Sequence, residues 1–127
     1  MIFGIGIDVV ENARVADAIR RHGDQFIQRI YQEGEAEYCR KMKDPAPHFA
    51  ARFAAKEAVS KAFGTGFAGQ FNWKDIEVRR KATGEPFIVL HDGAAELAKR
   101  LGIASVLISL SHSQDYAVAN AIVIKEK

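Results

Sequence analysis

Residues 52–66 read RFAAKEAVSKAFGTG, a run rich in alanine that contains no proline. This composition favours an α-helix, which we expect to begin near Pro47 and to end at Gly64, because glycine tolerates the left-handed conformation of a C-cap. Four alanines give the helix a flat face on which a sheet can pack closely: Ala51, Ala55, Ala58 and Ala62. Glu57 and Lys61 are one turn apart on another side, either as an exposed ion pair or as site residues.

Length and composition place the chain among ordinary globular proteins. It has 127 residues, of which 48% are hydrophobic and 27% charged, and this suits a single domain over residues 1–127. The net charge of +2 argues against a general nucleic-acid binder. Cys39 is the only cysteine, which excludes an intramolecular disulfide. No apolar run is long enough to span a membrane and the N-terminus lacks a signal-peptide pattern, so we expect a cytoplasmic protein with no membrane partner.

Residues 1–10 predict a strand with two different faces. A period of two gives the strand an apolar face, formed by Phe3, Ile5, Ile7 and Val9. The opposite face carries only Gly4, Gly6 and Asp8, so another backbone or a ligand can approach it closely. Asp8 is the one functional group on this bare face, where it either caps the helix that follows or belongs to a site.

The rest of the chain alternates helices and strands without a repeated βαβ unit. The pattern predicts helices over residues 11–22, 24–31, 35–42 and 93–101, and strands over residues 73–81, 86–90, 105–112 and 116–124. Strands that follow one another through short turns pair antiparallel. We therefore expect an α+β domain in which a mostly antiparallel sheet packs on the long central helix.

Three further features admit both a structural and a functional interpretation. Arg14 and Arg21 share one side of a predicted helix, as a solvated basic face or as a docking surface for an acidic partner. His112 stands at the end of its strand, as a structural or a site histidine. Residues 64–69 (GTGFAG) could cradle a phosphate through backbone N–H groups, but they lack the Gly-Lys-Ser/Thr ending of a P-loop.

Several stretches together resemble the holo-acyl-carrier-protein synthase family, the small type of 4′-phosphopantetheinyl transferase. The most specific match is to the family's second motif, at residues 53–66 (FAAKEAVSKAFGTG). The other matching stretches are residues 4–11 (GIGIDVVE) followed by Arg14, residues 73–78 (WKDIEV), residues 83–86 (TGEP) and residues 109–117 (SLSHSQDYA). One departure is residues 31–35 (YQEGE), where the family usually carries a threonine as the N-cap of its third helix.

The resemblance implies a 4′-phosphopantetheinyl transferase fold and a defined reaction. The family transfers 4′-phosphopantetheine from coenzyme A to a serine of an acyl carrier protein, needs Mg²⁺ and releases adenosine 3′,5′-bisphosphate. This reaction supports fatty acid biosynthesis. The longer type of transferase carries two such halves in one chain, so the resemblance implies an oligomer here, a homotrimer in the bacterial family, with sites between subunits.

The resemblance also distributes roles among the candidate catalytic residues Asp8, Glu57 and Lys61. Asp8 and Glu57 are the implied ligands of Mg²⁺, which prefers carboxylate oxygens together with substrate phosphates and waters. Glu57, directly or through a metal-bound water, is the candidate base for the serine hydroxyl, and Lys61 would stabilise the leaving bisphosphate. The candidate contacts to the charged nucleotide end of coenzyme A are Lys61, Arg52, Lys56 and His112. Arg14 and Arg21 would dock the acidic carrier protein.

Two alternatives use the same residues differently. A non-enzymatic module could bind an acidic protein through the arginine face alone, but it leaves Asp8 and Glu57 without a role. A metal-dependent phosphodiesterase or nucleotide hydrolase would use paired carboxylates and a lysine to transfer its substrate to water. An assay with coenzyme A, Mg²⁺ and apo-carrier protein separates the three, because only the transferase adds the mass of phosphopantetheine to the carrier.

Overall fold

The structure is a computed structural model that describes residues 1–64 and 72–127. Apart from Gly64, the glycine-rich segment at residues 64–69 therefore lies outside the described residues. The elements follow in the order β1 (Ile2–Glu11), α1 (Asn12–His22), α2 (Asp24–Ile30), α3 (Glu33–Arg40), α4 (Pro45–Phe63), η1 (Trp73–Asp75), β2 (Ile76–Arg80), β3 (Pro86–Leu90), α5 (Asp92–Leu101), β4 (Ile103–His112) and β5 (Tyr116–Lys125). This order, with antiparallel pairing between the described strands, confirms the α+β prediction.

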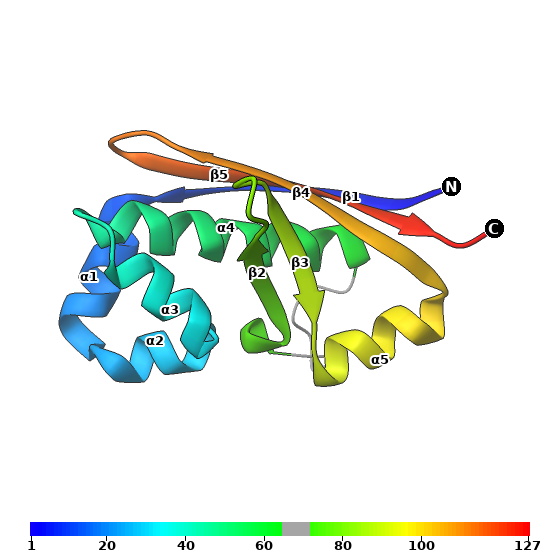
Figure 1. The fold of residues 1–127 in the computed structure, drawn as a ribbon, viewed down its shortest axis with the longest axis horizontal. Coiled ribbons are helices and arrows are strands. Elements are labelled where there is room, and N and C mark those ends of the chain that lie inside the picture. Colours follow the sequence, from blue (N-terminus) through cyan, green and yellow to red (C-terminus); the bar gives the residue numbers. More distant parts are fainter. Residues whose placement is uncertain (65–71) are drawn as a thin grey trace.

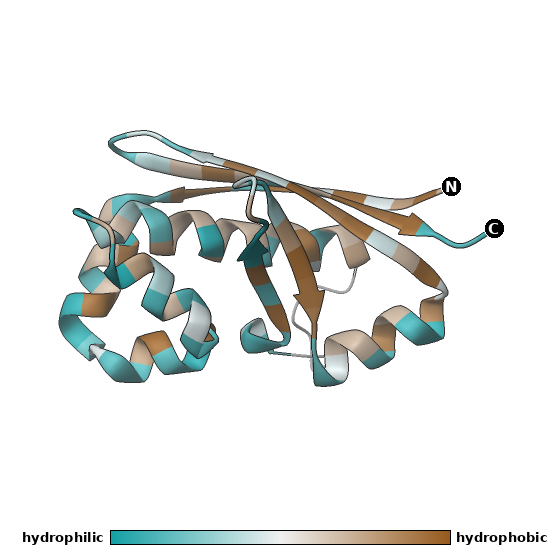
Figure 2. Ribbon diagram, viewed as in Figure 1, coloured by the Kyte–Doolittle hydropathy of each residue, from teal (hydrophilic) through white to brown (hydrophobic). Residues whose placement is uncertain are grey.

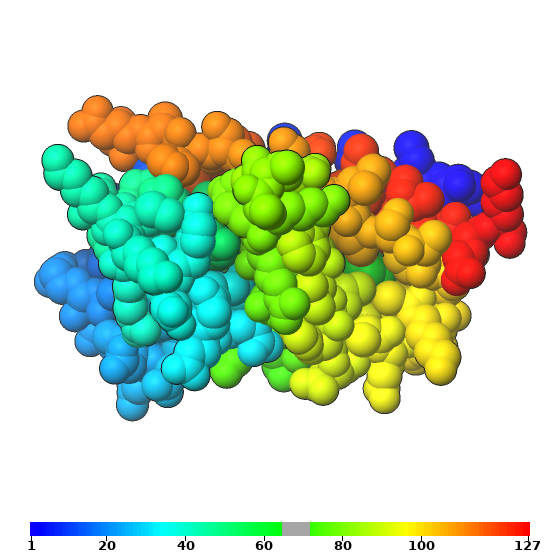
Figure 3. Space-filling view, viewed as in Figure 1, coloured from blue at the N-terminus to red at the C-terminus, as the bar shows by residue number. Residues whose placement is uncertain are grey.

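A three-stranded sheet and one long helix form the centre of the molecule (Figure 1). β5 lies between β1 and β4 and runs antiparallel to both, and α4 packs along one face of this sheet. α1, α2 and α3 gather at one end of α4 and α5 lies at the other, with the β2–β3 hairpin between them. In the space-filling view this hairpin covers the middle of the visible face (Figure 3).

Helix α4 begins slightly earlier than the sequence indicated and ends where it was predicted to end. Its first residue is Pro45 rather than Pro47, and a proline in the first turn is tolerated because the N–H it lacks has no partner inside the helix. Gly64 ends the helix in the left-handed conformation, at φ 81°, and donates its N–H to the Lys61 carbonyl. Among the described residues no helix is both long and apolar enough to cross a bilayer.

The bare face of β1 lies directly on α4, as predicted. A Cβ added at Gly4 would stand 2.0 Å from the carbonyl oxygen of Ala62, and one at Gly6 would stand 2.0 Å from that of Ala58. No real Cβ atom approaches another atom so closely, so only glycine fits at these two positions. The same close packing sets Asp8, the next residue on this face, beside the helix.

The apolar face of β1 points away from α4 and is exposed. Ile5, Ile7 and Val9 are 66%, 60% and 60% exposed. Figure 2 shows long apolar stretches along the strands of this sheet. The prediction that Phe3 shares this face is wrong, because the pairing of β1 with β5 shifts register between Ile2 and Gly4 and Phe3 packs against the core. An exposed apolar face of this kind is typical of an interaction surface.

Helix α3 accommodates the departure from the family's motif. Gln32 occupies the N-cap position where the family usually has threonine, and its backbone N–H donates to Glu35 Oε1 at 2.9 Å. The Gln32 side chain instead donates to the Lys74 carbonyl at 2.7 Å, which ties the start of α3 to η1. The helix therefore begins at Glu33, two residues before the predicted position.

Candidate active site

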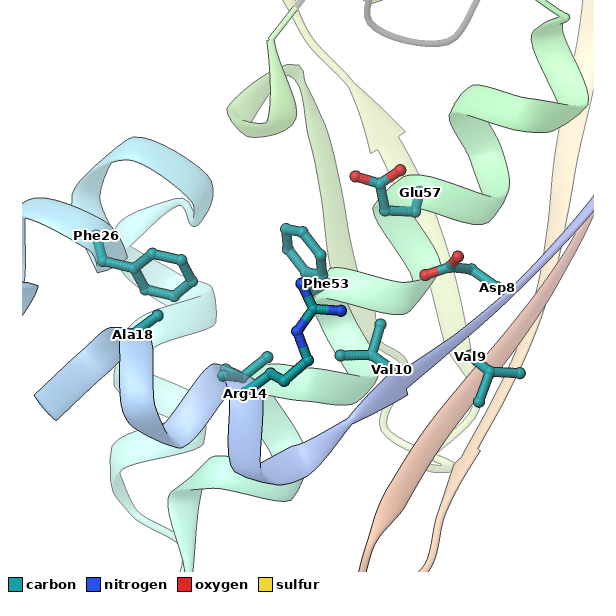
Figure 4. A pocket seen from close by; sticks show the side chains of 9 residues that line it. Asp8, Val9, Val10, Arg14, Ala18, Phe26, Phe53 and Glu57 are labelled. Atoms are coloured by element: carbon teal, nitrogen blue, oxygen red, sulfur yellow. The ribbon is translucent and has the colours of Figure 1, made fainter. Parts of the chain in front are cut away.

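The close packing of β1 on α4 brings two acids that are distant in the chain to one cavity. Asp8 from β1 and Glu57 from α4 both line a cavity of about 310 Å³. Figure 4 shows their carboxylates turned toward the same space. The rest of the lining is Val9, Val10, Arg14, Val15, Ala18, Phe26 and Phe53. The structure therefore brings the two predicted metal ligands to the lining of one cavity.

Lys61 pairs with Asp8 rather than with Glu57. Its Nζ donates to Asp8 Oδ1 at 2.9 Å and to the Ile7 carbonyl at 3.1 Å, and its side chain is 52% exposed. Asp8 does not cap the next helix, whose N-cap residue is Glu11 and whose first turn receives no side-chain cap. The two purely structural interpretations, an N-cap aspartate and an exposed Glu57–Lys61 pair, are therefore wrong.

Glu57 accepts a hydrogen bond from the only tryptophan of the chain. Trp73 Nε1 donates to Glu57 Oε1 at 3.0 Å. The indole also stacks on Phe53, one helical turn before Glu57, with ring centroids 6.1 Å apart and planes inclined by 28°. No described residue donates a hydrogen bond to the other carboxylate oxygen, Oε2. Trp73 was not singled out as a site residue from the sequence, although it opens the matching stretch WKDIEV.

The donor set fits a hard divalent cation. Mg²⁺ binds through one or two carboxylates and completes its coordination shell with substrate phosphates and water. Asp8 and Glu57 supply such a pair of carboxylates. Within the described residues no group of three or more His, Cys, Asp and Glu side chains converges.

The two candidate docking arginines of α1 have different surroundings. Arg14 lines the cavity, and Figure 4 shows its guanidinium near Phe53. Arg21 lies in the last turn of α1, where its side chain is 68% exposed and its Nε stands 3.5 Å from Asp17 Oδ2. Arg20 also pairs with Asp17 and is exposed. The predicted basic face therefore runs along α1 from the cavity toward solvent.

Lys56 cannot bind coenzyme A as predicted. Its amino group is fully buried and donates to Glu35 Oε1 at 2.8 Å, to the Trp73 carbonyl at 3.2 Å and to the Ile76 carbonyl. An ammonium group has three N–H donors, so these acceptors use all of them. Burial lowers the pKa of Lys56, and the Glu35 carboxylate opposes that effect. The prediction is wrong because a lysine that resembles a surface residue in the sequence enters the core.

Arg52 and His112 lie in a second cluster, which also contains His48. The His48 and His112 rings stand 4.8 Å apart between centroids. The Arg52 guanidinium stacks over the Tyr38 ring at 4.2 Å, and only 4% of the Arg52 side chain is exposed. Burial lowers the pKa of His48, as do the nearby charges of His112, Arg52 and Arg80. The guanidinium groups of Arg52 and Arg80, both over the Tyr38 ring, supply positive charge here, and positive charge attracts anions.

His48 was not anticipated from the sequence, although its spacing gave a usable signal. It precedes Arg52 by four residues, so both side chains project from the same side of α4. His112 reaches the same region from the end of β4. The cluster therefore consists of two side chains from one face of α4, His48 and Arg52, and one from the end of β4, His112.

The carboxylate cavity and the histidine cluster lie on opposite flanks of α4. Glu57 follows His48 by nine residues, which is about two and a half turns of helix at 3.6 residues per turn. The sheet shows the same separation, because Asp8 belongs to the edge strand β1 and His112 to the other edge strand, β4. The structure thus unites Asp8, Glu57 and Lys61, and it sets Arg52 and His112 apart from them.

Comparisons with known proteins agree along almost the whole chain. The model of the 4′-phosphopantetheinyl transferase superfamily matches residues 4–121. The holo-[acyl-carrier-protein] synthase of Koribacter versatilis is 48% identical over 122 residues, which cover 96% of this chain and 98% of that protein. The crystal structure of the Neisseria meningitidis holo-[acyl-carrier-protein] synthase has a TM-score of 0.91 at 32% identity and covers 98% of this chain and 100% of its own. The Helicobacter pylori synthase in complex with coenzyme A has a TM-score of 0.84 at 32% identity, over 94% and 98% of the two chains.

These matches decide between the alternatives left open by the sequence. The relatives are phosphopantetheinyl transferases over nearly their full length, so the non-enzymatic module is wrong. The shared fold includes the packing of β1 on α4 that carries Asp8 and Glu57. The chain therefore belongs to the holo-[acyl-carrier-protein] synthase family of the 4′-phosphopantetheinyl transferase superfamily.

Proposed function

We propose that this enzyme transfers 4′-phosphopantetheine from coenzyme A to a serine of an apo-acyl carrier protein, with Mg²⁺, and releases adenosine 3′,5′-bisphosphate. The observation that carries the proposal is that Asp8 and Glu57 share one cavity, with Lys61 bonded to Asp8. The names of the relatives and the coenzyme A in the H. pylori structure support the choice of substrates. A role in fatty acid biosynthesis and a cytoplasmic location go with this reaction.

The three residues divide the chemistry of transfer. Asp8 and Glu57 would hold Mg²⁺, which when bound neutralises charge on the pyrophosphate. The serine oxygen forms a bond to the phosphorus that carries pantetheine, and the bond from that phosphorus to the nucleotide's bridging oxygen breaks. Glu57 takes the serine proton directly or through a water. Lys61, whose side chain is half exposed, stabilises the negative charge left on the bisphosphate.

The nucleotide end of coenzyme A would bind at the His48–His112 cluster with Arg52 beneath it. The neighbouring Arg80 and the buried Arg52 supply positive charge for a phosphate, and the ring nitrogens of the two histidines can donate hydrogen bonds to it. In one copy of the chain this cluster and the Asp8 carboxylate occupy opposite flanks of α4. This separation favours an arrangement in which different copies supply the two halves of one coenzyme A site.

For this reason we propose an oligomer in which each site is completed by a second copy, and the resemblance to the bacterial family indicates a homotrimer. The exposed face of β1, with Ile5, Ile7 and Val9, supplies an apolar surface for the contact. Leu107 of β4 and Tyr116 of β5 are also large apolar residues with more than half of their surface exposed, at 54% and 52%. Three copies joined through such faces bury them and bring a histidine cluster to a neighbour's carboxylates.

Arg14 and Arg21 would guide the acidic carrier protein to the cavity. Arg14 lines the cavity itself and Arg21 extends the basic face along α1. Complementary charge across such a contact speeds encounter and sets orientation, and salt weakens it. The charge reversal Arg14→Glu should therefore raise the KM for carrier protein and leave the KM for coenzyme A unchanged. Equal carrier KM values in wild type and variant would remove Arg14 from the docking surface.

The proposal is tested by weighing the carrier. Wild-type enzyme with coenzyme A, Mg²⁺ and apo-carrier protein should add the mass of phosphopantetheine to the carrier, and removal of Mg²⁺ by a chelator should stop the addition. Glu57→Gln should abolish the transfer while the thermal unfolding midpoint stays near that of the wild type. Normal turnover by this variant would overturn the metal assignment, and cleavage of coenzyme A without modified carrier would indicate a hydrolase.

A further inference from the structure

The direction of the Glu57 carboxylate is set from outside the cavity. Glu57 projects from a helix through rotatable side-chain bonds, and a metal ligand must keep its oxygens in a narrow range of positions. The described residues give it one hydrogen-bond donor, Trp73 Nε1, at 3.0 Å from Oε1. We propose that Trp73 is a positioning residue that orients Glu57 for the divalent cation. This inference rests on the proposed function of Glu57.

The chemistry of an indole suits this task. Its N–H is a donor only, so it can hold one carboxylate oxygen without competing for the cation. It is also neutral, and it leaves the negative charge of the carboxylate for the metal. Because Oε1 is held, Oε2 of Glu57 is the oxygen left for the ion or for a proton. A lysine or arginine in the same place would neutralise the carboxylate instead.

The ring of Trp73 is fixed by a second contact. It stacks on Phe53 with centroids 6.1 Å apart and planes inclined by 28°. Phe53 precedes Glu57 by one turn of α4, so the stacking partner and the hydrogen-bonded carboxylate stand on the same side of one rigid helix. Rotation of the indole away from Glu57 would break the stacking as well as the hydrogen bond.

The backbone of Trp73 is fixed by buried Lys56. Lys56 Nζ donates to the Trp73 carbonyl at 3.2 Å, to the Ile76 carbonyl and to Glu35 Oε1 at 2.8 Å. Glu35 is fully buried too, and its Oε2 accepts the Val78 N–H at 3.0 Å. One ammonium thus ties α4 to the first residue of η1 and to the first residue of β2. Two adjacent residues of α4 therefore contact Trp73: Lys56 donates to its backbone carbonyl, and Glu57 accepts from its indole N–H.

The buried pair of Lys56 and Glu35 has a positioning role in addition to any effect on stability. A buried ion pair often adds little net stability, because desolvation offsets most of the attraction. Removing one partner is costly all the same, since the other is left charged and unpaired. Here the pair fixes the position of η1, and η1 carries the indole that faces Glu57. Partners that orient a metal ligand typically contribute about 10–100-fold to metal affinity or activity.

The test deletes the indole N–H and keeps the ring. Because Trp73 is the only tryptophan, growth of a tryptophan auxotroph on the benzothiophene analogue replaces this one residue by a ring of nearly the same shape with sulfur in place of N–H. Mn²⁺ binding in the presence of coenzyme A is then followed by electron paramagnetic resonance, alongside thermal unfolding. We expect Mn²⁺ affinity about tenfold weaker than in the normal protein, an unfolding midpoint within about 2 °C of it, and an unchanged KM for coenzyme A. Trp73→Phe should weaken Mn²⁺ binding in the same direction.

The Glu57→Gln variant separates the possible outcomes. If the analogue weakens Mn²⁺ binding in the normal protein but not in Glu57→Gln, the effect passes through Glu57, which supports the inference. If Glu57→Gln weakens binding while the analogue binds Mn²⁺ as the normal protein does, the proposed function stands and the positioning role of Trp73 is overturned. If Glu57→Gln binds Mn²⁺ as tightly as the normal protein, the metal assignment fails and the inference fails with it.

Discussion

A single methyl group at Gly6 should both destabilise the protein and disturb its site. A Cβ at this position would stand 2.0 Å from the Ala58 carbonyl oxygen and 2.8 Å from the Ala62 backbone nitrogen, whereas ordinary contacts begin at 3.4 Å. Relief would require the strand and the helix to separate by roughly 1.4 Å, the difference between the first and last of these distances. Both obstructing atoms belong to the backbone of buried α4, so no side-chain rotation can absorb the clash.

The size of the effect follows from overpacking. Extra methylenes forced into a packed core typically cost about 1–3 kcal/mol. A clash with the backbone of the central helix belongs at the upper end, so we expect Gly6→Ala to lower the free energy of unfolding by about 3 kcal/mol. For a chain of this length that corresponds to a fall of roughly 10–15 °C in the unfolding midpoint.

The matched control is Gly34→Ala in α3. A Cβ at Gly34 meets nothing within 4 Å and its φ is not positive, so alanine fits there. Alanine in a helix is favoured over glycine by about 0.5–1 kcal/mol, so this variant should unfold at or slightly above the wild-type temperature. Thermal and urea unfolding of both variants provide the comparison. A Gly6→Ala protein as stable as Gly34→Ala would refute the close contact between β1 and α4.

Two further predictions concern acid stability and assembly. Burial raises the pKa of the Glu77 carboxyl, but hydrogen bonds from Arg79 and His91 outweigh burial and hold that pKa below its ordinary value of 4.5. The unfolded chain therefore takes up this proton at higher pH than the folded chain. In urea titrations, the loss of unfolding free energy caused by Glu77→Gln should be largest above about pH 5 and should shrink as the pH falls below 4.5. A loss that does not depend on pH would contradict the assignment. Ile7→Lys should sediment at the mass of one chain and lose transfer activity while remaining folded, whereas an assembled and active variant would exclude the exposed face of β1 from the proposed trimer contact.

The features that the sequence predicted well are those encoded by neighbours in the chain. Alternating glycines in residues 1–10 and regularly spaced alanines in residues 51–62 each indicate a surface of small side chains, and two such surfaces can pack closely. The C-cap at Gly64 is equally local. Asp8 and Glu57 lie on or beside these surfaces, and it was the resemblance to the family that paired them before their common cavity was known.

The features that the sequence did not predict depend on partners far along the chain. Helix periodicity alone leaves Lys56 at the surface, and its burial requires Glu35 and two backbone carbonyls from the segment after α4. Phe3 left the apolar face of β1 because of a register shift in its pairing with β5, which depends on the C-terminal strand. The contact between His48 and His112 depends on the packing of the sheet against α4, which the local sequence does not reveal.

Helix α4 contributes both to the core and to the candidate site, because the side chains of successive helical residues point in directions about 100° apart. Lys56 therefore enters the core and closes the contact with η1, while the next residue, Glu57, faces the cavity, and Lys61 continues that flank toward Asp8. Small residues on the third side keep β1 close enough for this pairing. We therefore expect any change that lifts the strand or breaks the contacts of Lys56 with Trp73 and Ile76 to move Asp8 or Glu57, so such variants should lose the proposed transfer activity before they lose the fold.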